Sequence, residues 1–177
     1  MTSTSTGQAR AEEALSSQNP KAPLWAKLVG TFFYAGYGKP GPGTWGSVAT
    51  VLLWRGIGGM LQPAWQVPAA LVSAAAVTVI GIPAATRVAH EAGREDPSHV
   101  VVDEVAGQLI ALIGAPLGWK SLVAGLILFR AFDIMKPPPL RRLERLPEGV
   151  GIMMDDIGAG LYALVVMQVL LHFGFLR

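Results

Sequence analysis

Residues 67–86 read VPAALVSAAAVTVIGIPAAT, a run of 20 residues without a charged side chain. As an α-helix this run is about 30 Å long, which matches the hydrocarbon thickness of a bilayer. Residues 157–176 form a second such run, interrupted only by His172. The two runs predict a helical membrane protein.

The composition of the whole chain agrees with this prediction. The chain has 177 residues, of which 51% are hydrophobic and 15% are charged, against about 25% charged residues in soluble domains. The lack of cysteine excludes disulfides, cysteine-ligated metals and a thiol nucleophile. A net charge of +2 and a pI near 9.2 are too weakly basic to indicate a nucleic-acid partner.

Residues 1–23 are rich in Ser, Thr, Ala and Gln and contain no long apolar run. We expect them to form a flexible N-terminal tail rather than a secretory signal. Residues 24–177 then form a single helical domain.

Three further segments are candidates for membrane crossings: residues 46–61, 105–117 and 121–132. Lys120 and a Pro- and Gly-containing turn separate the last two, so this region is either one long helix or a hairpin of two short ones. The expected fold class is all-α, a polytopic protein with about four or five membrane segments. A soluble protein with very apolar buried helices is the alternative, because the segments beside Lys120 are short.

The charged residues gather on one side of such a bundle. If residues 1–45, 87–104 and 133–156 share a side, that side carries all 12 acidic residues of the chain. It also carries the basic residues Arg10, Lys21, Lys27, Lys39, Arg87, Arg94, Lys136, Arg141, Arg142 and Arg145, with Arg130 just inside the boundary. The opposite side carries only Lys120 and Arg177, and Arg55 lies within a segment. The positive-inside rule then predicts that the charged side is cytoplasmic.

Two pairs of acidic residues each begin an apolar helix. Asp103 and Glu104 begin one, and Asp155 and Asp156 begin the other. Helix capping explains either pair alone, because carboxylates accept backbone N–H bonds at a helix N-terminus. Two pairs on one membrane face, each followed by small residues that allow close helix packing, instead favour a shared cation. Mg²⁺ suits a site of oxygen ligands with open positions for phosphate.

A third acidic residue, Asp133, lies between two basic residues near the end of another helix. Arg130 precedes it by three residues and Lys136 follows it by three, so all three share a face if the helix continues. A local salt-bridge cluster is one interpretation. The other is a metal-binding or nucleophilic carboxylate between two phosphate-binding cations.

Residues 36–47 contain five glycines, with Lys39, Thr44 and Ser47 among them. Glycines allow backbone N–H groups to approach an anion, and these three side chains add donors for a phosphate. A structural turn before the first crossing is the alternative. His99, four residues before Asp103, is a weaker candidate for a general acid.

Taken together, these motifs resemble the phosphatidylglycerophosphatase A family from about Leu24 to the C-terminus. The matching residues are Pro42-Gly43-Thr44, Gly46-Ser47, Asp103-Glu104-x-x-Gly107, Phe129-Arg130-x-Phe132-Asp133-x-x-Lys136-Pro137 and Gly149-x-Gly151-Ile152-Met153-x-Asp155-Asp156-x-x-Ala159-Gly160. The tail and the additional prolines Pro138 and Pro139 depart from the family pattern without touching a candidate ligand.

The resemblance implies a Mg²⁺-dependent phosphatase of the bacterial inner membrane that converts phosphatidylglycerophosphate to phosphatidylglycerol and inorganic phosphate. It implies an acidic metal site, whose members would be Asp103, Glu104, Asp133, Asp155 and Asp156. Asp133, Asp155 and Asp156 are the catalytic candidates, and either metal-oriented water or an aspartate is the nucleophile.

The expected partners are the lipid substrate and the surrounding membrane lipids, and the small-residue helix faces are compatible with a homodimer. Two other functions remain alternatives. A transporter requires acidic residues within the membrane, and a non-catalytic metal-binding scaffold tolerates their loss.

Overall fold

The computed structural model describes residues 19–176, and this part of the chain is helical with no strand. The elements are α2 (Leu24–Gly30), η1 (Ala35–Tyr37), α3 (Pro42–Met60), α4 (Pro63–Ala92), α5 (Val102–Ala111), α6 (Trp119–Met135), α7 (Leu140–Leu143) and α8 (Glu148–His172). The prediction of an all-α fold is confirmed. Residues 1–18 of the predicted tail lie outside the described residues.

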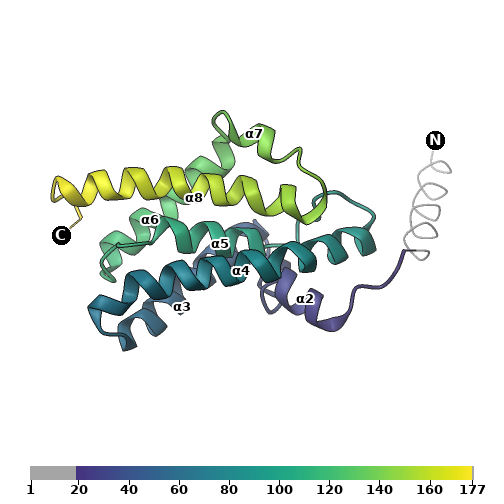
Figure 1. Ribbon diagram of the computed structural model, residues 1–177, viewed down its shortest axis with the longest axis horizontal. Coiled ribbons are helices and arrows are strands. Elements are labelled where there is room, and N and C mark those ends of the chain that lie inside the picture. Colours follow the sequence, from purple (N-terminus) through teal and green to yellow (C-terminus); the bar gives the residue numbers. More distant parts are fainter. Residues whose placement is uncertain (1–18, 177) are drawn as a thin grey trace.

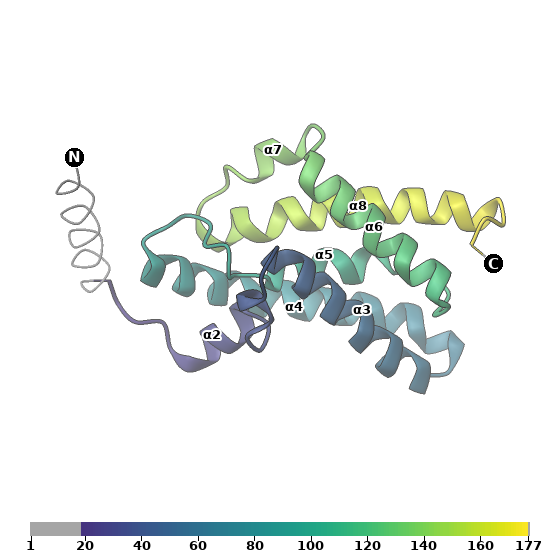
Figure 2. The same cartoon turned by 180° about the vertical axis from the view of Figure 1, so that it is seen from behind.

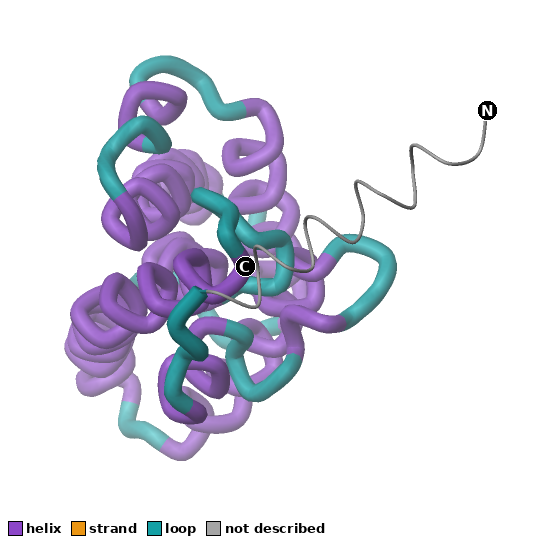
Figure 3. The backbone as a smooth tube through the Cα atoms, turned by 90° about the vertical axis from the view of Figure 1, so that its right-hand side faces the viewer, coloured by secondary structure: helices purple, strands orange, loops and turns teal. Residues whose placement is uncertain are grey.

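The short helix α5 is the centre of the bundle. It packs against α3, α4, α6 and α8 (Figure 1), and Figure 3 shows the described chain as helices joined by loops. Every one of the 10 residues of α5 except Glu104 is buried. Ten residues of α-helix are about 15 Å long, half the thickness of a bilayer core. The region left open as one helix or two is therefore two helices, of which α5 ends at Ala111 and is too short to cross a membrane alone.

The helices are arranged so that the bundle has two different ends. The α3–α4 turn, the α5–α6 turn and the C-terminal residues lie at one end, on the left in Figure 1. The Ser121 hydroxyl donates a hydrogen bond of 3.1 Å to the Leu176 carbonyl there. The starts of α3, α5 and α8 and the ends of α4 and α6 point away from that end (Figure 2). The acidic motifs of the sequence therefore share one half of the molecule.

Small residues set the distances between the helices. A Cβ built on Gly160 would collide with the Gly107 carbonyl oxygen, so α8 and α5 are in backbone contact. Gly149, at the start of α8, packs in the same way against Ile82 in α4, and its N–H donates to the Thr86 hydroxyl at 3.0 Å. These contacts hold the first half of α8 against α4 and α5.

The outer surface of the bundle is strongly apolar. Two helices, α4 and α8, are long and apolar enough to cross a membrane, with mean hydropathies of 2.0 and 1.6. Only 22% of the most apolar 18-residue stretch of α4 is buried, whereas a core helix of a soluble protein is mostly buried. Large exposed side chains on α3, α4, α6 and α8 include Leu52, Leu53, Ile57, Val72, Val79, Ile80, Val123, Ile127, Leu161, Val165 and Val169. Soluble monomers rarely expose apolar surface on this scale.

Candidate metal and phosphate site

Three carboxylates from two helices converge at the polar half of the bundle. Asp103 and Glu104 come from the first turn of α5, and Asp156 comes from the third turn of α8. One oxygen of each lies within 4.8 Å of the others. This is the spacing of side chains that share one cation, and carboxylate oxygens are the ligands that Mg²⁺ and Ca²⁺ prefer.

Burial makes this carboxylate group electrostatically unusual. Asp103 and Asp156 are buried, and one carboxylate oxygen of each of the three residues is enclosed without a hydrogen-bond partner in the described chain. Burial, followed by the neighbouring Glu104, raises the pKa of the Asp103 carboxyl well above its usual value. Carboxylates this close ionise together only when a positive charge compensates them. The oxygen-only donor set therefore fits a divalent cation.

Arg130 supplies positive charge at the edge of the carboxylate group. Its Nη1 lies 2.6 Å from Asp133 Oδ2, one turn further along α6, and 3.7 Å from Glu104 Oε1. All three side chains are less than one-fifth exposed. The i, i+3 pairing of Arg130 with Asp133 expected from the sequence is present within α6, and the contact of Arg130 with Glu104 links α6 to α5.

Lys136 and Asp155 form a separate pair beside this group. The Lys136 ammonium lies 2.8 Å from Asp155 Oδ2 and 3.1 Å from Glu144 Oε1. Burial opposes the charged form, but the two carboxylates outweigh it and raise the pKa of Lys136. Helix α6 ends at Met135, so Lys136 does not continue the helical face of Asp133. The pairing expected between Lys136 and Asp133 is thus replaced by one with Asp155 and Glu144.

The glycine-rich segment contributes through close approach. Gly43, in the first turn of α3, lies so near Glu104 that an added Cβ would collide with its carboxylate, and it would lie 3.0 Å from Arg130 Nη1. Ser47 is buried and donates its hydroxyl proton to the Gly43 carbonyl at 2.9 Å. Lys39 and Thr44 are exposed. The segment therefore places the N-terminus of α3 beside Glu104 and Arg130. The Ser47 hydroxyl proton is used within α3 and does not reach the carboxylate group.

His99 lies apart from the carboxylates. Its ring stacks on Tyr37 with 5.3 Å between centroids, and it lines a cavity of about 220 Å³ with the ion-paired Lys27 and Glu91. Burial lowers the pKa of its imidazole, which favours the neutral form. The structure therefore does not bring the weaker candidate for a general acid to the carboxylate group.

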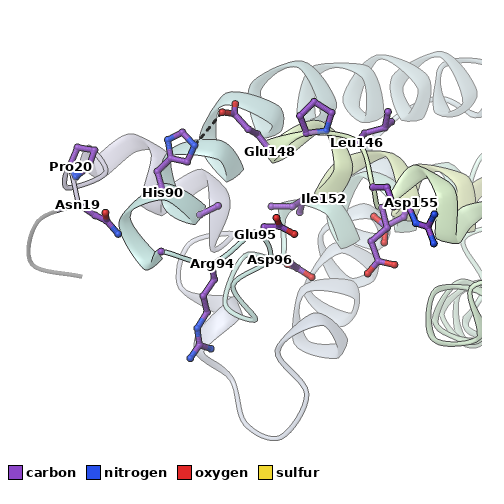
Figure 4. Close-up of a pocket in the computed structure, with 15 residues that line it drawn as sticks. Asn19, Pro20, His90, Arg94, Glu95, Asp96, Leu146, Glu148, Ile152 and Asp155 are labelled. Atoms are coloured by element: carbon purple, nitrogen blue, oxygen red, sulfur yellow. Dashed lines mark ion pairs between the residues drawn. The ribbon is translucent and has the colours of Figure 1, made fainter. Parts of the chain in front are cut away.

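A cavity of about 740 Å³ opens beside the site (Figure 4). It lies between the end of α4, the loop after it and the start of α8, and Asp155 lies at the end opposite Asn19 and Pro20. His90 and Glu148 form an ion pair of 3.3 Å along it. Sequence reasoning did not single out Glu144, which lines this cavity and bonds Lys136. The sequence spacing does not predict the pairing of Glu144 with Lys136, because a proline-rich turn separates the two residues.

The fold and the site define a class: an all-helical protein with an apolar exterior and a buried carboxylate group next to an arginine. The family model of phosphatidylglycerophosphatase A matches residues 28–171. The chain belongs to the phosphatidylglycerophosphatase A family.

Curated relatives agree with this family assignment. Two are named phosphatidylglycerophosphatase A: one from Haemophilus influenzae, 37% identical over 79% of this chain and 85% of its own, and one from Escherichia coli, 32% identical over 92% and 90%. A Bacteroides thetaiotaomicron protein, 38% identical over 80% of this chain and 91% of its own, is provisionally named a phosphatidylinositol-3-phosphatase. No solved structure matches the chain significantly.

Proposed function

We propose that this protein hydrolyses the terminal phosphate monoester of phosphatidylglycerophosphate, giving phosphatidylglycerol and inorganic phosphate in phospholipid biosynthesis. The family and the names of two relatives support the reaction. The observation that carries the proposal is the group of Asp103, Glu104 and Asp156, whose oxygens lie within 4.8 Å of one another beside Arg130. Hydrolysis of phosphate monoesters is very slow without a catalyst, so it requires a concentrated electrostatic site of this kind.

The cofactor in this proposal is Mg²⁺. Asp103, Glu104 and Asp156 would hold it, because each has a buried carboxylate oxygen without a partner in the described chain. Bound there, Mg²⁺ supplies a Lewis acid for the phosphate oxygens and lowers the pKa of a bound water. Asp133 and Asp155 would be additional members of the metal site, although each already pairs with a cationic side chain.

Arg130 and Lys136 bind the phosphate in this proposal. Arg130 Nη1 pairs with Asp133, but its buried Nε has no hydrogen-bond partner in the described chain, and a guanidinium matches the geometry of two phosphate oxygens. The bond that breaks joins phosphorus to the glycerol oxygen, which leaves with a proton, and the bond that forms joins phosphorus to a water oxygen. If an aspartate attacks first, water then cleaves the aspartyl phosphate and releases inorganic phosphate. Asp133, Asp155 or Asp156 would move the proton or act as the nucleophile in this proposal.

The proposed location is the bacterial cytoplasmic membrane, with α3, α4, α6 and α8 in the bilayer and α5 enclosed between them. The exposed apolar side chains of these four helices support this arrangement. The carboxylate group lies at the half of the bundle where the basic loops lie, which the positive-inside rule assigns to the cytoplasm. A lipid headgroup could enter there while its acyl chains stay in the bilayer.

The test is phosphate release by the purified full-length protein in detergent micelles, with Mg²⁺ and then with EDTA. Phosphatidylglycerophosphate and phosphatidylinositol 3-phosphate are supplied separately and in competition. We expect Mg²⁺-dependent release with preference for phosphatidylglycerophosphate. Preference for the inositol lipid would overturn the substrate, release that is insensitive to EDTA would overturn the metal, and no release from folded protein would favour a scaffold or transporter.

A further inference from the structure

The Lys136 ammonium is held by two carboxylates that come from different segments. Asp155 in α8 accepts a hydrogen bond of 2.8 Å, and Glu144, just after α7, accepts one of 3.1 Å. An ammonium group has three N–H donors in a fixed tetrahedral arrangement. With two of them directed at Asp155 and Glu144, the direction of the third is set.

The backbone of Lys136 does not by itself place this ammonium group. Lys136 ends α6 in the left-handed region, with φ of 43°, and its N–H caps the helix by donating to the Phe132 carbonyl at 2.8 Å. From that point the side chain extends through four flexible carbons, which carry considerable rotamer freedom. One anchor leaves the ammonium free to turn about it, whereas two anchors on different segments fix its position.

The Lys136 side chain is accessible to a ligand. Lys136 is about one-quarter exposed, and it lines a cavity of about 530 Å³ together with Glu144, Arg141 and Arg145. Asp155, its other anchor, is bonded in the chain to Asp156 of the carboxylate group. An anion that enters at this edge of the site therefore meets a cation whose free donor is already oriented.

We propose that Glu144 is a positioning residue: together with Asp155 it orients the Lys136 ammonium so that one N–H remains for a phosphate oxygen of the ligand. This inference rests on the proposed function for the identity of the ligand. Glu144 itself touches neither the phosphate nor the metal. Its effect passes through Lys136.

The alternative is that Glu144 only ties the α7 segment to the bundle. Both roles involve the same ion pair, but they differ in what happens once Lys136 is gone. If Glu144 only positions Lys136, replacing Glu144 has no further effect on phosphate binding once the ammonium has been removed. If Glu144 has a structural role, replacing it still weakens phosphate binding in that background. A double-mutant cycle separates the two.

The experiment measures binding of inorganic phosphate to full-length protein in detergent with Mg²⁺, through the shift of the thermal unfolding midpoint, together with KM and kcat for the lipid. The variants are Glu144→Gln, Glu144→Asp, Lys136→Met and the double variant Glu144→Gln/Lys136→Met. Glu91→Gln is the matched control, because it removes the carboxylate of another lysine pair, 2.7 Å from Lys27 and outside the carboxylate group.

We expect Glu144→Gln to weaken phosphate binding and raise KM roughly 3- to 10-fold with a smaller effect on kcat, as for loss of one partly exposed charged hydrogen bond. Glu144→Asp should recover most of this loss, Glu91→Gln should match wild type, and Glu144→Gln should add nothing in the Lys136→Met background. An undiminished effect in that background, or wild-type phosphate binding by Glu144→Gln, overturns the inference. Phosphate binding with this pattern but without lipid hydrolysis would refute the proposed function and leave the inference intact.

Discussion

Gly160 of α8 lies directly on the backbone of Gly107 of α5, so that an added Cβ would collide with the Gly107 carbonyl oxygen. A Cβ on Gly107 would in turn meet the Asp156 carbonyl oxygen and the Phe129 ring. This contact between two glycines is what allows Asp103 and Glu104 to approach Asp156. The small residues that follow each acidic pair therefore set the geometry of the site.

The first prediction concerns this contact. Gly160→Ala should separate α5 from α8, reduce the unfolding free energy by about 1–3 kcal/mol and abolish most Mg²⁺-dependent activity, because overpacking displaces the backbone. Thermal unfolding and phosphate release in detergent measure the two effects. Gly56→Ala in α3 is the control, since a Cβ there meets nothing within 4 Å. Equal behaviour of the two variants would show that the glycine contact is unimportant.

The second prediction tests the carboxylate group. Asp156→Asn should lower activity by at least about 100-fold and remove the stabilisation that Mg²⁺ gives to the folded protein, because a bound metal contributes several kcal/mol to catalysis and stabilises the state that binds it. The readout is the change in the unfolding midpoint between Mg²⁺ and EDTA. Glu91→Gln removes a carboxylate elsewhere and should keep the full Mg²⁺ response. An unchanged response in Asp156→Asn would remove this residue from the metal site.

The third prediction concerns Arg130. Arg130→Gln should cost about 3 kcal/mol of unfolding free energy, because Asp133 and Glu104 lose the buried cation between them. Arg130→Lys should recover more stability than activity, since an ammonium keeps the charge but cannot bind two phosphate oxygens in one plane. Denaturant unfolding and KM for the lipid are compared across the two variants. Full activity in Arg130→Lys would show that charge alone suffices.

The fourth prediction concerns Gln108, which is fully buried one turn after Glu104. Neither atom of its amide has a hydrogen-bond partner in the described chain. Replacing an unpaired buried polar group by an apolar one of similar shape is neutral or stabilising. Gln108→Met should therefore keep the fold and raise the unfolding free energy by up to about 1 kcal/mol. Lower stability would show that the amide has a partner in solution, such as water.

The fifth prediction tests membrane insertion. Val79 lies near the middle of α4 and is 71% exposed. In water Val79→Lys would be harmless, but at the centre of a membrane helix it costs about 2.5–3.5 kcal/mol. We expect the variant to be depleted from the membrane fraction of expressing cells, with Val79→Leu as the control. A soluble and well-folded Val79→Lys protein would favour the soluble alternative.

The sequence determined the helical class and the position of most helices. Residues 67–86 lack charged side chains and are mostly apolar, and a run of this length indicates a helix although it contains Pro68, Gly81 and Pro83. The acidic and basic candidates were also visible, because their residue types alone limit what they can bind. The Arg130–Asp133 pair was predictable for the same reason, since an i, i+3 spacing on one helix fixes the neighbours.

Only the tertiary structure decided which of these residues meet. Asp103, Glu104 and Asp156 converge because two glycines let α5 and α8 touch, and contacts between distant segments have no local signal in the chain. Lys136 pairs with Asp155 and Glu144 instead of Asp133 because α6 stops at Met135 and the next residue turns left-handed. Spacing along a helix predicts neighbours only while the helix continues, and beyond its last residue the packing of other segments decides.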